Sequence, residues 1–357
     1  FPNGSNYALL PEAMKKGLVK PETFERAVKN VLKHKFRLGM FDKDAYLYSK
    51  DDITLDSPED RQTAFDIASQ SIVLLENNGI LPLQTKTPNI LLTGPNANSM
   101  WAMCGDYSYP SMAYFWKKTD VGSENPHIAT LNEGMTKRMP QGFNLKYSRG
   151  CDWTEEIETK YDVVGAGDER AWEYEILHRK VESGEKANAA EALSMAKESD
   201  VIIAAMGENV MLCGENRDRK GIRLPGKQEQ YVESLIATGK PVVLVPFGGR
   251  AMPLSEKIIK GCAAIIEAWY PGEEGGNALA DILYGKISPS AKLSVSYPNV
   301  ELNEPICYNY SDTKDSRIQW PFGHGLSYST FEYSDLKIAN EAKTSDEAVT
   351  LTFNVKN

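Results

Sequence analysis

The sequence predicts an α/β protein in which helices cover both faces of a mostly parallel sheet. Short, continuous apolar runs recur along the chain, and such runs are typical of strands buried on both faces. They lie at residues 89–94, 201–206, 241–247 and 263–268. Segments with a helical pattern lie at residues 60–75, 187–197, 226–237 and 275–284. This alternation of strands and helices indicates an α/β sandwich, which we assign to residues 51–325.

The two ends of the chain differ from this pattern. Residues 1–50 contain a helix signal that begins at Pro21 and stops near Gly39, since proline favours the first helical turn and glycine the position after the last. One face of this helix is apolar and needs a partner surface; it consists of Phe24, Ala27, Val28, Val31 and Leu32. Residues 326–357 include the alternating run 349–355, which predicts the first strands of a β-sandwich.

An aromatic stretch interrupts the alternation between residues 101 and 184, where we expect long loops and small sheets. Exposed aromatic rings can stack on the apolar faces of sugars, whereas buried rings anchor loops, and both roles are open for this group. The side chains concerned are Tyr107, Tyr109, Tyr114, Phe115 and Trp116.

Composition limits the classes of function. With 41% hydrophobic and 25% charged residues, the 357-residue chain is typical of a globular protein. The net charge of -9 disfavours nucleic acid and anionic membrane surfaces as partners, and no apolar run reaches membrane-spanning length. Five widely spaced cysteines without a CxxC pair argue against a disulfide framework. The sequence has neither zinc or calcium spacings nor a phosphate-binding glycine loop, so we expect no metal and no cofactor.

The most informative segment is the loop after the strand 201–206, which leads to a helix opened by Leu224-Pro225-Gly226. Ligands of parallel α/β sheets collect at this edge of the strands. The loop carries acids and arginines that could surround a polar substrate, namely Glu208, Glu215, Arg217, Asp218 and Arg219. A solvated loop with internal ion pairs would have the same composition, so the loop alone does not decide between the two interpretations.

Four motifs in the same order resemble glycoside hydrolase family 3. The acid/base loop of that family is similar to the set Gly214-Glu215, Asp218-Arg219, Leu224-Pro225-Gly226 and Gln228. Residues 68–83 (ASQSIVLLENNGILPL) resemble the start of its second domain. Residues 268–276 (AWYPGEEGG) and 320–328 (WPFGHGLSY) resemble its later landmarks. The resemblance extends from residue 1 to about residue 335.

The resemblance implies three parts. Residues 1–50 would be the end of a (β/α)8 barrel with its linker, residues 51–325 an α/β sandwich of the six-stranded type, and residues 326–357 the start of a fibronectin type III-like domain. The implied activity is that of an exo-acting retaining β-glycosidase that removes terminal sugars from β-linked oligosaccharides or glycosides. β-Glucosidase is the first expectation, β-xylosidase the second, and a non-catalytic carbohydrate-binding module the third. The family also implies a periplasmic or secreted protein, while the oligomeric state, including a homo-oligomer, stays open.

The resemblance assigns the role of general acid/base to Glu215, with Glu208 as the rival acid. The nucleophilic aspartate would lie on a barrel segment outside this chain, so we expect the chain alone to be inactive. Substrate contacts are expected from Glu208, Arg217, Tyr107, Tyr109 and Trp116. Arg219 is expected to be structural.

Five further features have simpler interpretations than catalysis. We expect Cys213 to pack, and Glu273 and Glu274 to cap a helix N-terminus. His324 is expected to pack or to form a hydrogen bond, and the pairs Gly248-Gly249 and Gly275-Gly276 are interpreted as turns.

Overall fold

The computed structural model describes residues 5–42, 54–112, 127–153, 163–164, 186–210, 212–213, 218–219, 221–299, 306–310, 317–338 and 348–357. The chain divides into two compact units, Phe1–Ser57 and Pro58–Asn357. No helix in the described ranges is both long and apolar enough to cross a membrane.

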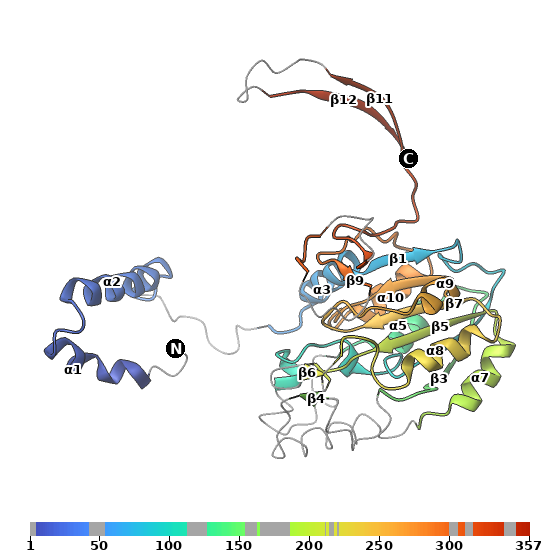
Figure 1. The fold of residues 1–357 in the computed structure, drawn as a ribbon, viewed down its shortest axis with the longest axis horizontal. Helices are drawn as coiled ribbons and strands as arrows, with labels where there is room; N and C mark the ends of the chain where they lie inside the picture. Colours follow the sequence, from blue (N-terminus) through green and yellow to red (C-terminus); the bar gives the residue numbers. More distant parts are fainter. Residues whose placement is uncertain are drawn as a thin grey trace. The chain divides into compact units, whose positions relative to one another are not determined.

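Six strands of the second unit form one sheet, in the order β1-β8-β7-β5-β2-β3 (Figure 1). Their bounds are β1 Val73–Asn77, β2 Asn89–Thr93, β3 Asn144–Ser148, β5 Val201–Gly207, β7 Val242–Phe247 and β8 Ala264–Glu267. Neighbouring strands are parallel except for the pair of β1 with β8. The mostly parallel sheet predicted from the sequence is confirmed, and the four predicted apolar runs form its inner strands.

Helices cover both faces of this sheet and enclose two hydrophobic cores. Side chains of α3, α5 and α10 enter one core, and side chains of α7, α8 and α9 enter the other. The helices are α3 Pro58–Ser71, the 3-10 turn η3 Met100–Ala102, α5 Leu131–Arg138, α7 Ala189–Glu198, α8 Gln228–Ile236, α9 Glu256–Gly261 and α10 Gly275–Leu283. Every residue of β5 and of β7 is buried, because alternate side chains along each strand point into the two cores. The α/β sandwich is therefore confirmed.

Both edge strands differ from the sequence-based expectation. The predicted helix 60–75 stops at Ser71, and the chain continues as β1, antiparallel to β8. A continuous apolar run, Ile72-Val73-Leu74-Leu75, fits a helix and a buried strand equally well, and pairing with β8 decides the outcome. The other edge strand, β3, has the largely polar sequence NLKYS and gains its place by pairing with β2 along its whole length.

The second glycine pair is a correction to the sequence-based interpretation. Gly275-Gly276 does not form a turn but begins α10, where it lets this helix approach α5. A Cβ on Gly276 would lie 2.0 Å from the carbonyl oxygen of Thr130, and one on Gly134 would lie 2.1 Å from the carbonyl oxygen of Gly276. These distances leave no room for a side chain, so glycine is required at both positions of the crossing.

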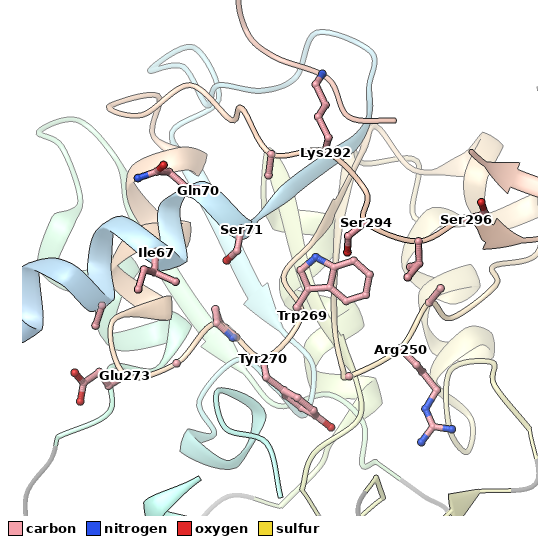
Figure 2. Close-up of a pocket in the computed structure, with 17 residues that line it drawn as sticks. Ile67, Gln70, Ser71, Arg250, Trp269, Tyr270, Glu273, Lys292, Ser294 and Ser296 are labelled. Atoms are coloured by element: carbon pink, nitrogen blue, oxygen red, sulfur yellow. The ribbon is translucent and has the colours of Figure 1, made fainter. Parts of the chain in front are cut away.

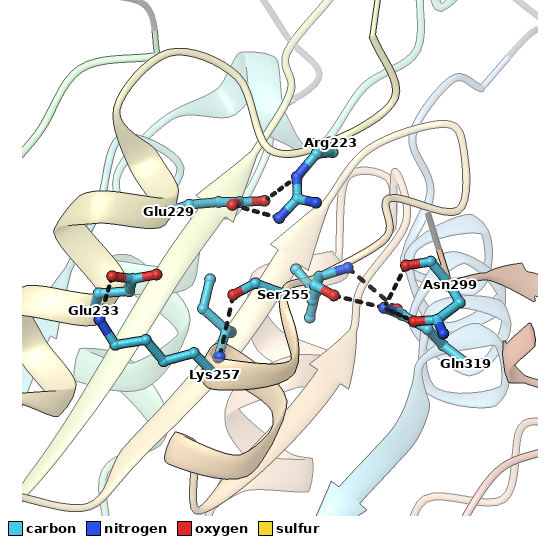
Figure 3. Close-up of polar contacts among 9 residues, drawn as sticks. Arg223, Glu229, Glu233, Ser255, Lys257, Asn299 and Gln319 are labelled. Atoms are coloured by element: carbon cyan, nitrogen blue, oxygen red, sulfur yellow. Dashed lines mark hydrogen bonds and ion pairs between the residues drawn. The ribbon is translucent and has the colours of Figure 1, made fainter. Parts of the chain in front are cut away.

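Polar contacts join the elements on the α8 and α9 side of the sandwich (Figure 3). Lys257 on α9 lies 2.5 Å from Glu233 on α8, and the hydroxyl of Ser255 accepts a hydrogen bond from the backbone N–H of Ile258 at the start of α9. Gln319 binds the backbone of Leu254 twice, because its amide donates to the carbonyl at 2.5 Å and its carbonyl accepts from the N–H at 3.1 Å. These contacts fix the loop between β7 and α9.

The first unit contains helices whose apolar side is exposed within the unit. Its elements are η1 Ser5–Leu9, α1 Leu10–Lys15 and α2 Pro21–Arg37. Pro21 occupies the predicted place at the start of α2, and Gly39 follows the helix end with φ 66°. The exposed fractions of Phe24 and Val31 are 37% and 57%. The assignment of residues 1–50 to the end of a barrel stays a prediction.

Three pairs of short strands complete the described chain. They are β4 Val163–Val164 with β6 Asp218–Arg219, β9 Tyr297–Pro298 with β10 Ile318–Trp320, and β11 Glu332–Ile338 with β12 Leu351–Lys356, all antiparallel. The last pair contains the predicted alternating run, and every residue of its two strands is exposed. That these strands open a fibronectin type III-like domain stays a prediction.

Candidate active site

The candidate site lies at the carboxyl edge of the sheet. Taken in chain order, the five parallel strands β2, β3, β5, β7 and β8 are arranged 2-1-3-4-5, so the direction of winding reverses between β2 and β5. Ligands of open α/β sheets bind outside the carboxyl ends of the strands at such a reversal. The loop singled out from the sequence leaves the sheet here, at the end of β5.

A buried polar network fixes the end of β5. The Asn96 side chain, which follows β2, donates to the carbonyls of Met206 and Glu208 at 3.0 and 3.1 Å. The Gln228 carbonyl accepts from the N–H of Gly207 at 2.7 Å, and its amide donates to the Gly207 carbonyl at 2.9 Å. Gly207 has φ 120°, and a Cβ there would lie 2.0 Å from the carbonyl oxygen of Phe247. The hydrogen bonds from Asn96 and Gln228 and the close approach of Gly207 to Phe247 therefore fix the path of the chain at the end of β5.

Glu208 is the first residue after β5, and its side chain is completely buried. Its Oε2 lies 3.3 Å from Nε of Arg250, which belongs to the loop after β7. The same guanidinium donates from Nη2 to the sulfur of Cys213 at 3.0 Å. Burial lowers the pKa of Arg250, but the Glu208 carboxylate and the Cys213 sulfur together outweigh it, so the pKa is raised and the guanidinium stays charged.

A second buried carboxyl group, Glu267, lies at the end of β8. The Tyr297 hydroxyl donates to its Oε2, and the backbone N–H of Trp269 donates to its Oε1 at 3.1 Å. Burial raises the pKa of Glu267 to about 8, while these two hydrogen bonds lower it and the charge of Glu208 raises it further. Glu267 is therefore largely protonated at neutral pH. Sequence analysis missed this residue, although an acid at the end of a buried apolar run was a usable signal.

A cavity of about 1030 Å³ is lined in part by Arg250 and by Trp269, which follows Glu267 by two residues in the sequence (Figure 2). Trp269 adopts φ 56°, a conformation that few side chains tolerate, and its ring lies 6.4 Å from that of Tyr297. Figure 2 shows the indole in the middle of the cavity, with Lys292 on one side and the guanidinium of Arg250 on another. An indole face, two cations and several hydroxyl groups suit a polar ligand that also has an apolar face.

Several predicted site residues lie outside the described ranges: Glu215, Arg217, Tyr114, Phe115 and Trp116. Only the backbone of Arg219 is described, in β6. Tyr107 and Tyr109 follow η3 and are 66% and 56% exposed, so they are not the buried anchors that the sequence left open. Glu208 in contrast has no exposed atom surface to offer a substrate in this structure, and its carboxylate faces Arg250.

The remaining motifs mostly follow expectation. Glu274 stands at the N-cap of α10, but its carboxylate makes no capping bond and instead accepts hydrogen bonds from Arg61 at 3.1 Å and Asn277 at 2.5 Å. His324 makes the expected hydrogen bond, 2.9 Å from the Leu75 carbonyl. Cys262 is buried in the core, and this burial raises the pKa of its thiol to about 12.

Comparison with known proteins agrees with this architecture. The C-terminal domain of glycosyl hydrolase family 3 matches residues 72–328, and the chain belongs to this family. The resemblance inferred from the four motifs is thereby confirmed.

Named relatives are β-glucosidases and β-xylosidases. A periplasmic β-glucosidase of Salmonella typhimurium is 30% identical over 372 residues, which cover 98% of this chain and 46% of that protein. A β-xylosidase of Formosa agariphila is 27% identical over 346 residues, which cover 93% of this chain and 43% of that protein. A solved β-glucosidase from Erythrobacter marinus has a TM-score of 0.73 and 30% identity, and covers 99% of this chain and 46% of its own. The chain thus spans about half the length of these relatives.

Proposed function

We propose that this chain is part of an exo-acting retaining β-glycosidase that removes terminal sugars from β-linked glycosides. The observation that carries the proposal is the Gly214-Glu215 signature of family 3, which follows β5 in sequence at the carboxyl edge of the sheet. β-Glucosides are the first substrates to test and β-xylosides the second, because relatives of both names match nearly the whole chain.

In this proposal Glu215 acts as general acid/base, and the nucleophile lies on a segment outside this chain. The two carboxyl groups of a retaining glycosidase stand about 5 to 5.5 Å apart. While the nucleophile is charged, its field would raise the pKa of Glu215 and keep the proton needed by the leaving oxygen. Formation of the glycosyl-enzyme would remove that charge, and Glu215 could then take a proton from water. Without the nucleophile, the chain alone would not hydrolyse glycosides.

The exposed rings of Tyr107 and Tyr109 support a role in sugar binding, since exposed aromatic faces suit the apolar side of a pyranose. Trp116 and Arg217 are proposed to join them, on the basis of their residue types and their places in the sequence. For the cellular location, we propose the periplasm or the medium, which is supported by the name of the Salmonella typhimurium relative.

Glu215→Ala in the intact protein tests this assignment. We expect hydrolysis of phenyl β-glucoside to fall by about 10²- to 10⁴-fold, the usual contribution of a general acid. With the 2,4-dinitrophenyl glycoside, whose leaving group departs without an acid, added azide should restore turnover of the variant, because this small anion attacks the glycosyl-enzyme without help from a base, and the product should be the β-glycosyl azide. Arg138→Ala, a change at an ion pair on α5, is the control. Full activity of Glu215→Ala on the phenyl glycoside would contradict the proposal.

A further inference from the structure

The guanidinium of Arg250 connects the sheet to the loop that carries the signature. It lies between two side chains of the segment that follows β5: Glu208 at its beginning, 3.3 Å away, and Cys213 further along, 3.0 Å away. Arg250 itself comes from the loop after β7, the strand adjacent to β5. A single side chain thus ties the β5 loop to the neighbouring strand at a point beyond the end of the sheet.

We propose that Arg250 is a positioning residue that holds the Cys213 end of this loop, so that Glu215 is presented for catalysis. This inference rests on the proposed function, in which Glu215 is the acid/base. Two residues of chain span at most about 7 Å, so fixing Cys213 restricts where Glu215 can be. The planar, multidentate guanidinium suits this task, because its five N–H donors can bind two acceptors at the same time.

The support behind Arg250 is rigid. Glu208 is buried, its N–H donates to the Phe247 carbonyl at 2.7 Å, and its own carbonyl accepts from Asn96. Both backbone hydrogen-bonding groups of Glu208 are therefore held by neighbouring elements, and this supports the carboxylate that faces Arg250. Because the buried Glu208 carboxylate restrains the Arg250 guanidinium, the hydrogen bond from Arg250 to Cys213 has a defined direction.

The packing beneath Cys213 is close. A Cβ on Gly249, the residue before Arg250, would lie 3.0 Å from the Tyr270 ring and 3.7 Å from the Cys213 sulfur. A Cβ on Gly248 would lie 2.9 Å from Met252 and 3.4 Å from the Glu208 carboxylate. The glycine pair therefore allows the loop after β7 to pack closely against the loop after β5. This close packing supports a specific contact between the two loops.

The alternative is that Arg250 only stabilises the fold, and Arg138 provides a matched comparison. Both arginines are partly exposed, at 24% and 28% of the side chain, and each faces a buried carboxylate, Glu208 or Asp281, that is 0% or 7% exposed. Arg138 lies on α5 and pairs with α10, so its loss removes a similar ion pair without touching the β5 loop.

The test measures kcat/KM of the intact protein for two glycosides that differ in their need for an acid. The 2,4-dinitrophenyl glycoside has a leaving group that departs without protonation, whereas the phenyl glycoside needs a proton. We expect Arg250→Ala to lower the value for the phenyl glycoside about 10- to 100-fold more than the value for the dinitrophenyl glycoside. Arg138→Ala should change both by the same factor, because a loss of folded enzyme affects every substrate equally.

Further variants separate the route through Cys213 from a failure to fold. Cys213→Val keeps the volume and the Glu208 pair but removes the acceptor, so it should give a smaller selective loss with an unchanged melting temperature. The double variant with Arg250→Ala should be no more selective than Arg250→Ala alone, since both changes cut one connection. If Arg250→Ala does not accumulate, Cys213→Val decides the question.

Two results would overturn the inference, and they differ. If Glu215→Ala selectively lowers kcat/KM for the phenyl glycoside but neither Arg250→Ala nor Cys213→Val does so, the positioning role is wrong and the acid/base assignment stands. If Glu215→Ala itself lowers kcat/KM for both substrates by the same factor, the acid/base assignment is wrong, and the positioning role that rests on it is wrong as well.

Discussion

Glu267 should make the stability of the sandwich depend on pH in a direction opposite to that of most acids. Its pKa is about 8 in the folded protein, against 4.5 for an unperturbed group. Between these values the folded state binds a proton that the unfolded state has released, so the free energy of unfolding falls as pH rises. The stabilisation is fully present below pH 4.5 and is lost as pH rises through about 8.

The expected slope follows from the linkage relation. A single proton held only by the folded state changes the free energy of unfolding by about 1.4 kcal/mol per pH unit. Over the interval from 4.5 to about 8, the total is on the order of 4 to 5 kcal/mol. Glu267→Gln has nearly the same shape as the protonated acid and does not titrate, so this contribution should disappear.

The measurement is urea denaturation from pH 5 to pH 9, followed by the fluorescence of Trp269 and its neighbours. We expect wild type and Glu267→Gln to differ little at pH 5, and the variant to become the more stable of the two as pH rises to 8. Tyr297→Phe should move the wild-type transition to higher pH, because the lost hydroxyl group donates to the carboxylate and lowers its pKa. A difference between wild type and Glu267→Gln that does not change with pH would refute the reasoning.

Two further predictions concern packing and the polar network. Gly276→Ala should lower the free energy of unfolding by about 2 kcal/mol, since its Cβ would lie 2.0 Å from the backbone carbonyl oxygen of Thr130, the residue before α5. Gly105→Ala, with its nearest neighbour at 3.7 Å, should change the same free energy by less than about 0.5 kcal/mol. Equal thermal shifts for the two variants would contradict this. Gln228→Ala should cost about 2 to 4 kcal/mol in urea denaturation, because it leaves the buried N–H and C=O at the end of β5 without partners; a cost typical of a surface residue would argue against that.

The inner strands of the sheet could be predicted from the sequence, and the edge strands could not. β5 and β7 are continuous apolar runs because both of their faces are covered, and that pattern is visible locally. β3 has polar and half-exposed side chains, so nothing in its own sequence distinguishes it from a loop. Its assignment depends on pairing with β2, which is separated from it by residues 94–143.

The same distinction applies to the candidate site. The loop after β5 and its position at the carboxyl edge could both be predicted from the sequence, because the motif of the loop is contiguous. Arg250 was not found, because its meaning depends on Cys213 and Glu208, which lie about 40 residues earlier in the chain. Only the parallel neighbourhood of β5 and β7 brings the three together.

Two buried acids near one another at this edge are stabilised in different ways, and the difference suggests how the sandwich serves the loop. Glu208 is fully buried and faces the guanidinium of Arg250 at 3.3 Å. Glu267 has hydrogen-bond donors but no cation in the contacts described, and burial keeps it largely protonated at neutral pH. An ionised Glu267 would repel the charge of Glu208. Keeping it neutral avoids a second buried negative charge beside Glu208, and so favours the contact of Arg250 with Glu208 and Cys213.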